Sequence, residues 1–164
     1  MLDQSNIPYD IPTTKKINTI NIGVGIFVVD SNFEKILIGK RKDCDKFAQP
    51  GGWCEFTEEW EECGSRELFE ETNINIPKER FIHIKTVNGY DKINNFHNVV
   101  VELLVEVNHE EIKEMKNMEP NKCEGWFWAD YDFIERNMDK LFFPMRTFIN
   151  ITNFKNISDF KDML

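Results

Sequence analysis

The sequence predicts a mixed α/β fold in a single domain. Segments 19–30 and 96–107 are rich in β-branched residues, as buried strands are, whereas residues 57–72 between them have a helical pattern. The chain has 164 residues, of which 41% are hydrophobic and 30% are charged, which suits one globular domain with a substantial core. Residues 19–164 contain no repeat or dividing linker, and the polar residues 1–18 are predicted to form a loosely tethered N-terminal arm.

The remaining elements follow from local composition. Five segments are predicted to be strands: 19–30, 35–42, 80–90, 96–107 and 125–130. Residues 43–53 are predicted to be a loop, and the polar residues 108–124 a partly helical excursion. A short helix with an acidic start is expected after the last strand, and a final helix is expected to begin at Pro144.

Charge and cysteine usage exclude several classes of function. The chain has 29 acidic and 20 basic residues, and its net charge of −9 argues against a nucleic-acid polymer as partner. Its four cysteines form no C-x-x-C pair, which favours free thiols in a reducing, cytoplasmic location. No signal peptide and no apolar run near the ~20 residues of a membrane span is evident, so no membrane partner is expected.

The predicted helix concentrates negative charge on a face that should be buried. On a helical wheel one face has an apolar half and an acidic half, made by Trp60, Cys63, Gly64, Glu67, Glu71 and Ile74. Thr57 is expected to cap this helix, Glu70 lies at the margin of the face, and Phe69 points away from it. An inward carboxylate is costly unless it is paired or binds a metal, and Arg66 cannot neutralise three glutamates. The pattern therefore favours a hard divalent cation, with a partly exposed acidic helix as the alternative.

Glycines and basic residues before the helix support a phosphate site. Gly51 and Gly52 let the backbone approach a ligand closely, and a glycine carbonyl there could add a metal ligand. One strand earlier, Lys40 and Arg41 provide positive charge for phosphates, although a solvated strand end would explain them equally well.

Residues 52–74, GWCEFTEEWEECGSRELFEETNI, resemble the Nudix box, G-x5-E-x7-R-E-U-x-E-E-x-G-U, in which U is a bulky aliphatic residue. The matching positions are Gly52, Glu58, Arg66, Glu67, Leu68, Glu70, Glu71 and Ile74. One position departs from the box, because Asn73 stands where the family has glycine. Asn tolerates a left-handed backbone second best after Gly, so the turn after the helix is expected to survive.

Residues 19–150 resemble the MutT-type branch of the family, and within it the nucleoside triphosphate diphosphatases known for oxidised and thiopurine nucleotides. The resemblance implies an α/β/α sandwich with a mixed sheet, a requirement for Mg²⁺ or Mn²⁺, and hydrolysis of a nucleoside diphosphate linked to another group. A nucleoside triphosphate substrate would yield the monophosphate and pyrophosphate. It also implies that Glu67, Glu70, Glu71 and the Gly51 carbonyl bind metal and that Arg66 orients Glu67. Glu71 is our candidate for the residue that accepts a proton from the attacking water.

Substrate recognition is less specified by the sequence. Aromatic candidates for contacting the base are Trp53, Tyr90, Phe96 and Trp128, with burial in the core as the alternative for most of them. Glu124 is a candidate for reading a base edge or assisting at the metal, with a solvated loop carboxylate as the alternative. Two alternatives stay open: a dinucleoside polyphosphate hydrolase, in which Tyr90 would take part, and a Nudix sensor that binds nucleotides without turnover. The resemblance also makes a homodimer plausible, with the outward Phe69 as weak support.

Overall fold

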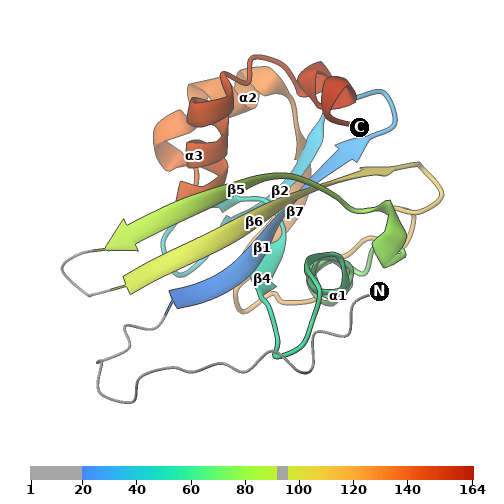
Figure 1. Ribbon diagram of the computed structural model, residues 1–164. Helices are drawn as coiled ribbons and strands as arrows, with labels where there is room; N and C mark the ends of the chain where they lie inside the picture. Colours follow the sequence, from blue (N-terminus) through green and yellow to red (C-terminus); the bar gives the residue numbers. More distant parts are fainter. Residues whose placement is uncertain (1–19, 92–95) are drawn as a thin grey trace, which may run out of the picture.

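The computed structural model describes residues 20–91 and 96–164, which form a mixed β-sheet between two helical layers (Figure 1). The strands are β1 (Ile20–Asp30), β2 (Ile36–Arg41), β3 (Phe47–Ala48), β4 (Gly51–Trp53), β5 (Ile82–Asp91), β6 (Phe96–Val107) and β7 (Cys123–Ala129). Their order is β3-β2-β1-β6-β5, with β4 paired to β1 and β7 paired to β2. The β1–β6 pair is parallel and the other pairs are antiparallel, so the predicted α/β/α sandwich with a mixed sheet is confirmed.

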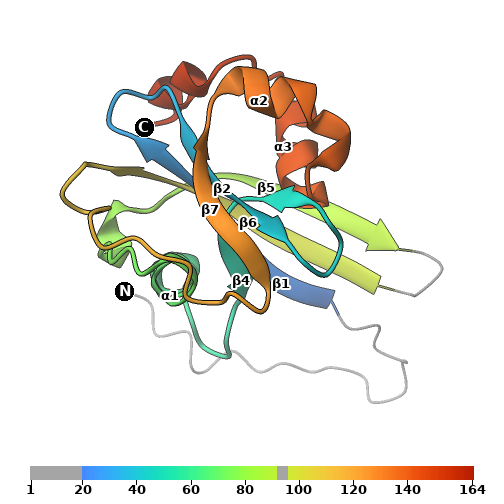
Figure 2. The same ribbon diagram turned by 180° about the vertical axis from the view of Figure 1, so that it is seen from behind.

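The helices lie on both faces of this sheet. Helix α1 (Trp60–Thr72) covers one face, while α2 (Tyr131–Arg136), α3 (Phe143–Thr152) and the 3-10 helix η4 (Ile157–Met163) cover the other (Figures 1 and 2). Two further 3-10 turns are η2 (Lys78–Arg80) and η3 (Met138–Lys140). None of the helices in the described ranges is long and apolar enough to cross a bilayer.

Strand β1 is apolar along most of its length because both of its faces are buried. Its even-numbered residues, such as Ile26 and Val28, pack into the core shared with α1. Its odd-numbered residues pack into the core shared with α3, where the Phe27 and Phe148 ring centroids are 4.6 Å apart. A strand covered on both faces has a continuous apolar run rather than an alternating one, as this sequence does.

Two of the expected irregular segments differ from the structure. The predicted loop 43–53 contains the short strands β3 and β4, which are too short to produce a periodic pattern. The excursion that follows β6 forms turns, and no helix is present in residues 108–122. Its start is fixed by the Asn108 side chain, whose Oδ1 accepts the backbone N–H groups of Glu110 and Glu111 and so competes with a helix. The final helix begins at Phe143, one residue before the predicted start, and the predicted N-terminal arm lies outside the described residues.

Candidate active site

Helix α1 begins later than its sequence pattern suggests. Its N-cap is Glu59, which forms a capping box with Glu62, and the Glu59 backbone N–H donates to Glu62 Oε2 at 3.1 Å. The predicted cap, Thr57, is wrong, because it precedes the helix by three residues and has a φ of 74°. Trp60 is therefore in the first turn, where it is 40% exposed, and the expectation that it faces the sheet is also wrong.

The helix ends as the box requires, although it lacks the usual glycine. Asn73 has a left-handed backbone with φ 61°, and its N–H donates to the Phe69 carbonyl oxygen at 2.9 Å. The Asn73 side chain also donates to the Glu114 carbonyl oxygen at 2.9 Å, which ties the turn to a neighbouring segment. The expectation that Asn preserves this turn is confirmed. Phe69 is 46% exposed, as predicted for a residue on the outer side of the helix.

The buried face of α1 is formed by Cys63, Gly64, Leu68 and Thr72. Glu67 and Glu71 lie beside this face rather than within it, so both can be partly shielded without entering the core. Strand β4 lies directly under Glu67. A Cβ atom on Gly52 would be 2.3 Å from the Glu67 carboxyl carbon, so only glycine leaves room for the carboxylate in this position.

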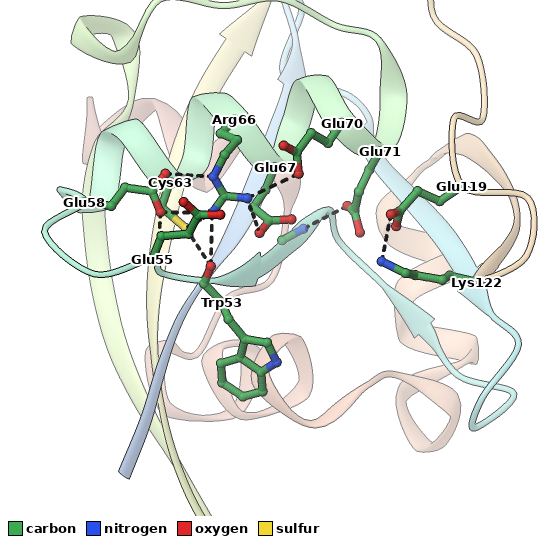
Figure 3. Close-up of polar contacts among 11 residues, drawn as sticks. Trp53, Glu55, Glu58, Cys63, Arg66, Glu67, Glu70, Glu71, Glu119 and Lys122 are labelled. Atoms are coloured by element: carbon green, nitrogen blue, oxygen red, sulfur yellow. Dashed lines mark hydrogen bonds and ion pairs between the residues drawn. The ribbon is translucent and has the colours of Figure 1, made fainter. Parts of the chain in front are cut away.

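Arg66 forms hydrogen bonds and ion pairs with three glutamates of the box (Figure 3). Its Nε and Nη2 donate to the two oxygens of Glu58 at 2.8 and 2.9 Å, and its Nη1 donates to Glu67 Oε1 at 2.7 Å and to Glu70 Oε2 at 3.2 Å. Nη2 also donates to the Trp53 carbonyl oxygen at 3.0 Å. The paired guanidinium lowers the pKa of Glu58 to about 2. This network fixes where the Glu67 carboxylate lies, whereas the Glu70 side chain is 53% exposed.

Glu71 is placed differently from its neighbours. Its Oε2 accepts the backbone N–H of Gly51 at 3.0 Å, and no Lys or Arg among the described residues forms an ion pair with it. Burial raises the pKa of Glu71 to about 8, although the Gly51 N–H opposes this shift, and the nearby carboxylates of Glu67 and Glu119 raise the pKa further. Figure 3 shows Glu119 directed toward Glu71. A carboxylate so poorly compensated is suited to a cation.

The donor chemistry of this site fits a hard divalent metal ion, since all candidate side chains offer carboxylate oxygens. Among residues 20–91 and 96–164, however, no three His, Cys, Asp or Glu side chains are grouped closely enough to hold a metal as they stand. Arg66 binds one oxygen of Glu67 and one oxygen of Glu70. The second oxygen of each carboxylate has no hydrogen bond among the described residues and could accept a cation.

A cavity of about 450 Å³ joins the predicted residues of α1, β2 and β4. The predicted site residues that line it are Arg41, Gly51, Gly52, Arg66, Glu67 and Glu71. Arg41 forms an ion pair with Asp43, and its guanidinium carbon lies 4.4 Å from the centroid of the Phe142 ring. The structure thus brings most of the sequence-derived set together around one space.

Two predicted substrate contacts lie elsewhere. Lys40 forms ion pairs with Asp45 at 2.7 Å and with Glu124 at 3.4 Å, and neither Lys40 nor Glu124 lines the cavity. They meet each other on the surface because β2 pairs with β7. Glu70 does not line the cavity either.

Three of the four aromatic candidates for base recognition are described by the structure, and none of the three points into the acidic part of the cavity. Trp53 lines the cavity, but the residue is 51% exposed and Figure 3 shows its ring pointing away from the glutamates. Tyr90 is 67% exposed and contacts the His97 ring. Trp128 packs against the core on the α1 side, and the Phe96 side chain lies outside the described residues.

Sequence reasoning missed several cavity residues that come from distant segments. Glu119 and Lys122 belong to the excursion after β6 and are paired at 2.7 Å. Six further missed residues form a wall on the α3 side: Gln49, Asn98, Val100, Phe142, Phe143 and Pro144. For Glu119 the signal was its place in MEPNKCEGWFW, which entered the resemblance without a role for this residue. No local pattern identifies the others.

Behind this wall lies a buried acid, Glu102, which is fully inaccessible to solvent. Gln49 Nε2 donates to its Oε2 at 2.9 Å, while Glu102 Oε1 and Gln49 Oε1 have no partner among the described residues. Burial raises the pKa of Glu102 to about 8, and the bond from Gln49 lowers it only in part. The neutral acid is therefore the favoured form in the folded protein at neutral pH.

Replacing Glu102 by glutamine is expected to change how stability depends on pH. Between pH 4.5 and about 8 the folded protein keeps the Glu102 proton that the unfolded chain has lost, so stability falls as pH rises through this window. This group contributes at most about 1.4 kcal/mol per pH unit. Glu102→Gln is neutral throughout, so its stability relative to the parent should increase steadily in urea titrations from pH 5 to 8. Parallel pH profiles for the two proteins would contradict the assignment.

Comparison with known proteins identifies the family to which the chain belongs. The NUDIX domain matches residues 19–149. The chain is similar to the crystal structure of a MutT NUDIX hydrolase from Burkholderia pseudomallei, with 27% identity and a TM-score of 0.61, over 70% of this chain and 86% of that one.

Two more distant structures share the fold. One is a bifunctional NMN adenylyltransferase/ADP ribose pyrophosphatase from Francisella tularensis, complexed with AMP and a Mn ion, at 22% identity and a TM-score of 0.67. The match covers 84% of this chain but only 42% of that one. The other is the C. elegans Ap4A hydrolase, at 16% identity and a TM-score of 0.57, over 80% of this chain and 95% of that one. The family match over residues 19–149 shows that the chain belongs to the Nudix family, as a MutT-like pyrophosphohydrolase.

Proposed function

We propose that the protein is a Mg²⁺-dependent nucleoside triphosphate pyrophosphohydrolase that releases nucleoside monophosphate and pyrophosphate. The proposal rests on one observation: Glu67 and Glu71 of α1 line the same cavity as a wall of aromatic and amide side chains. A nucleotide has the same two parts, charged phosphates and a flat base with donors and acceptors. Oxidised or otherwise modified purine nucleotides are included as substrates because the sequence resembles that group of diphosphatases.

The acidic end of the cavity is proposed to bind the phosphates through a metal ion. Nudix hydrolases generally use a divalent metal, and we assign Mg²⁺, with Mn²⁺ as a substitute. When bound, the ion would neutralise charge on the phosphate oxygens. Glu67, Glu70 and Glu71 would hold it together with the Gly51 carbonyl, as the resemblance to the box implies.

Three charged residues of the site have separate proposed roles. A cation bound beside Glu71 would favour its ionised form in spite of the raised pKa. The ionised Glu71 is then proposed to accept a proton from the attacking water at Oε1, because the Gly51 N–H occupies Oε2 and no hydrogen bond among the described residues uses Oε1. Arg66 keeps Glu67 in place through the 2.7 Å ion pair. Arg41 lines the cavity and supplies positive charge close to the phosphates.

The opposite wall is proposed to bind the nucleoside. Phe142 and Phe143 provide apolar surface for a planar ring. Gln49 and Asn98 are amides, which offer both donors and acceptors to a base edge. Both amides are largely buried, so an unpaired base edge would leave polar groups unsatisfied, which favours selectivity.

A nucleotide panel tests the proposal. Common, oxidised and thiopurine nucleoside triphosphates, a dinucleoside tetraphosphate and ADP-ribose are incubated with the protein and Mg²⁺, and the products are separated by ion exchange. We expect pyrophosphate and monophosphate from triphosphates, ranked by kcat/KM. Turnover of the dinucleotide or ADP-ribose alone would overturn the assignment in favour of those classes. Nucleotide binding without any turnover would instead identify a sensor.

Removal of divalent metal is expected to abolish turnover without unfolding the protein. The sheet and both cores are built from apolar contacts that involve no candidate metal ligand. Treatment with EDTA should therefore leave the circular dichroism spectrum unchanged, and Mg²⁺ or Mn²⁺ should restore activity. Undiminished turnover in EDTA would contradict the metal assignment.

A cytoplasmic location is also part of the proposal. It is supported by the four cysteines, all of which are free in the structure, as expected in a reducing compartment. A homodimer stays a prediction, with the exposed Phe69 as its structural basis.

A further inference from the structure

Gln49 and Glu102 form a buried polar pair on the nucleoside side of the catalytic cavity. Gln49 lines the cavity and is 8% exposed, whereas Glu102 is inaccessible to solvent. Gln49 Nε2 donates to Glu102 Oε2 at 2.9 Å. An amide offers a ligand either a donor or an acceptor, depending on which of its atoms is already bonded. The partner of Gln49 therefore decides what Gln49 can recognise.

A glycine in β1 makes room for this pair. Strands β1 and β6 are parallel neighbours, and Gly25 of β1 is paired with Glu102 of β6. A Cβ atom on Gly25 would be 2.5 Å from Glu102 Oε2 and 2.6 Å from Gln49 Nε2. Gly25 lines the cavity as well. The bonded atoms of the pair thus lie against the part of the β1 backbone that the cavity reaches.

The two remaining oxygens of the pair have no partner. Gln49 Oε1 and Glu102 Oε1 are both inaccessible to solvent and form no hydrogen bond among the described residues. Burial raises the pKa of Glu102, and the bond from Gln49 opposes this shift without any contribution from a charged side chain. The neutral acid has one donor and one acceptor, as a primary amide has, so a single proton on Glu102 can satisfy both oxygens.

Of the two polar atoms of the Gln49 amide, only Nε2 is left to meet a ligand, because Oε1 is inaccessible. Nε2 carries two hydrogens, and Glu102 accepts one of them. The other amide of this wall, Asn98, also has its oxygen occupied, since Oδ1 accepts from Asn21 Nδ2 at 3.3 Å. Both amides therefore offer donors to the cavity, which suits a base edge that presents a lone pair.

We propose that Glu102 is a positioning residue for substrate selection, which as a neutral acid holds Gln49 with its free N–H toward the cavity, where this donor selects purines by a lone pair on the base edge. Glu102 Oε1 donates its proton to Gln49 Oε1, and the two bonds of the cyclic pair hold the amide in one orientation. This role rests on the proposed function, in which the cavity binds a nucleotide, and it adds the class of base atom that Gln49 recognises.

Binding of nucleoside monophosphates tests this role separately from turnover. Titration calorimetry compares guanosine monophosphate with three analogues, each of which lacks one acceptor: N3, N7 or the 6-oxo group. We expect one analogue to bind about tenfold more weakly than guanosine monophosphate, the scale of one buried hydrogen bond left unmade. Equal affinities for all four compounds, or no binding of any of them, would overturn the proposal.

Variants separate positioning from a structural role. Glu102→Gln keeps one donor and one acceptor and should preserve the parent's preference. Glu102→Leu removes both and should abolish it, as should Gln49→Met. Combining the last two changes should have no further effect on the preference, because Glu102 acts through Gln49. Glu106→Leu is the control, since Glu106 is on the same strand but does not line the cavity, and it should keep the preference.

Pyrophosphate release from triphosphates by the parent is measured in parallel. A parent with the expected binding preference that hydrolyses no triphosphate would contradict the proposed reaction but support the role of Glu102. A preference that persists in folded Gln49→Met, or that is lost in Glu102→Gln as fully as in Glu102→Leu, would overturn the role of Glu102 whether or not triphosphates are hydrolysed.

Discussion

Glu71→Gln is expected to fold normally and to lower kcat by at least ~100-fold, the usual scale for removing a proton-transfer group. Glutamine keeps the shape of the side chain and can still accept the Gly51 N–H bond that Glu71 makes at 3.0 Å. It cannot accept a proton from water. Without metal, stability should be little changed below about pH 7 and should exceed that of the parent as pH rises toward 8, because burial raises the pKa of Glu71 to about 8 and the ionised form is the costly one. Steady-state kinetics at saturating metal, together with thermal unfolding, measure both effects.

The same helix provides a control for this variant. Glu61→Gln changes an equivalent side chain that makes no ion pair among the described residues and does not line the cavity. It should retain normal turnover. Saturating Mn²⁺ should not rescue Glu71→Gln if proton transfer is what has been lost. Near-normal turnover in a folded Glu71→Gln protein would assign the general base to another residue.

Arg66→Gln is expected to cause the largest loss of stability of any single change in the site. The Glu58 and Glu67 side chains are only 12% and 14% exposed, and removal of Arg66 leaves both without their cation. Breaking such a pair costs about 3 kcal/mol. For a protein of this size, that corresponds to a fall in Tm of roughly 6–12 °C. Differential scanning calorimetry at neutral pH measures the change.

Acid should reduce the difference between Arg66→Gln and its parent. Arg66 lowers the pKa of Glu58 from 4.5 to about 2, so the stabilisation from this pair is present above pH 4.5 and is lost as pH falls toward 2. Lys78→Gln serves as the control, since Lys78 is 39% exposed and pairs with Glu59 and Glu62 at the surface. That change should cost no more than about 1 kcal/mol. Equal losses for the two variants would show that the Arg66 network contributes no more than a surface pair.

The features that could be predicted from the sequence depend on residues close together in the chain. All charged residues of the box lie between Glu58 and Glu71, within one helix and the turn before it, so their spacing identifies them without knowledge of the rest of the chain. The long strands β1 and β6 were predicted correctly because a strand buried on both faces has a long apolar run. Strands β3 and β4, with two and three residues, leave no such pattern.

It was harder to predict from the sequence where a side chain points and which distant residues it contacts. A strand pattern does not say which neighbour a polar residue meets, and the pairing of β2 with β7 brought Lys40 to Glu124 rather than to the cavity. The helical wheel placed Trp60 toward the sheet, but the helix starts there and the residue lies in its exposed first turn. The wheel did separate Glu71, which it placed on the inward face, from Glu70, which it placed at the margin and whose side chain is 53% exposed.

The family, the helix that carries the box and the kinds of side chain on it could be predicted from the residues alone, because these follow from spacings within a few turns of chain. Which of these groups line one cavity with Glu119, Gln49, Asn98 and Phe142 depends on tertiary packing. These residues come from separate elements and meet through the packing of two helical layers on a sheet. That packing also sets how far each carboxylate is removed from water, and hence its charge, which no local pattern records.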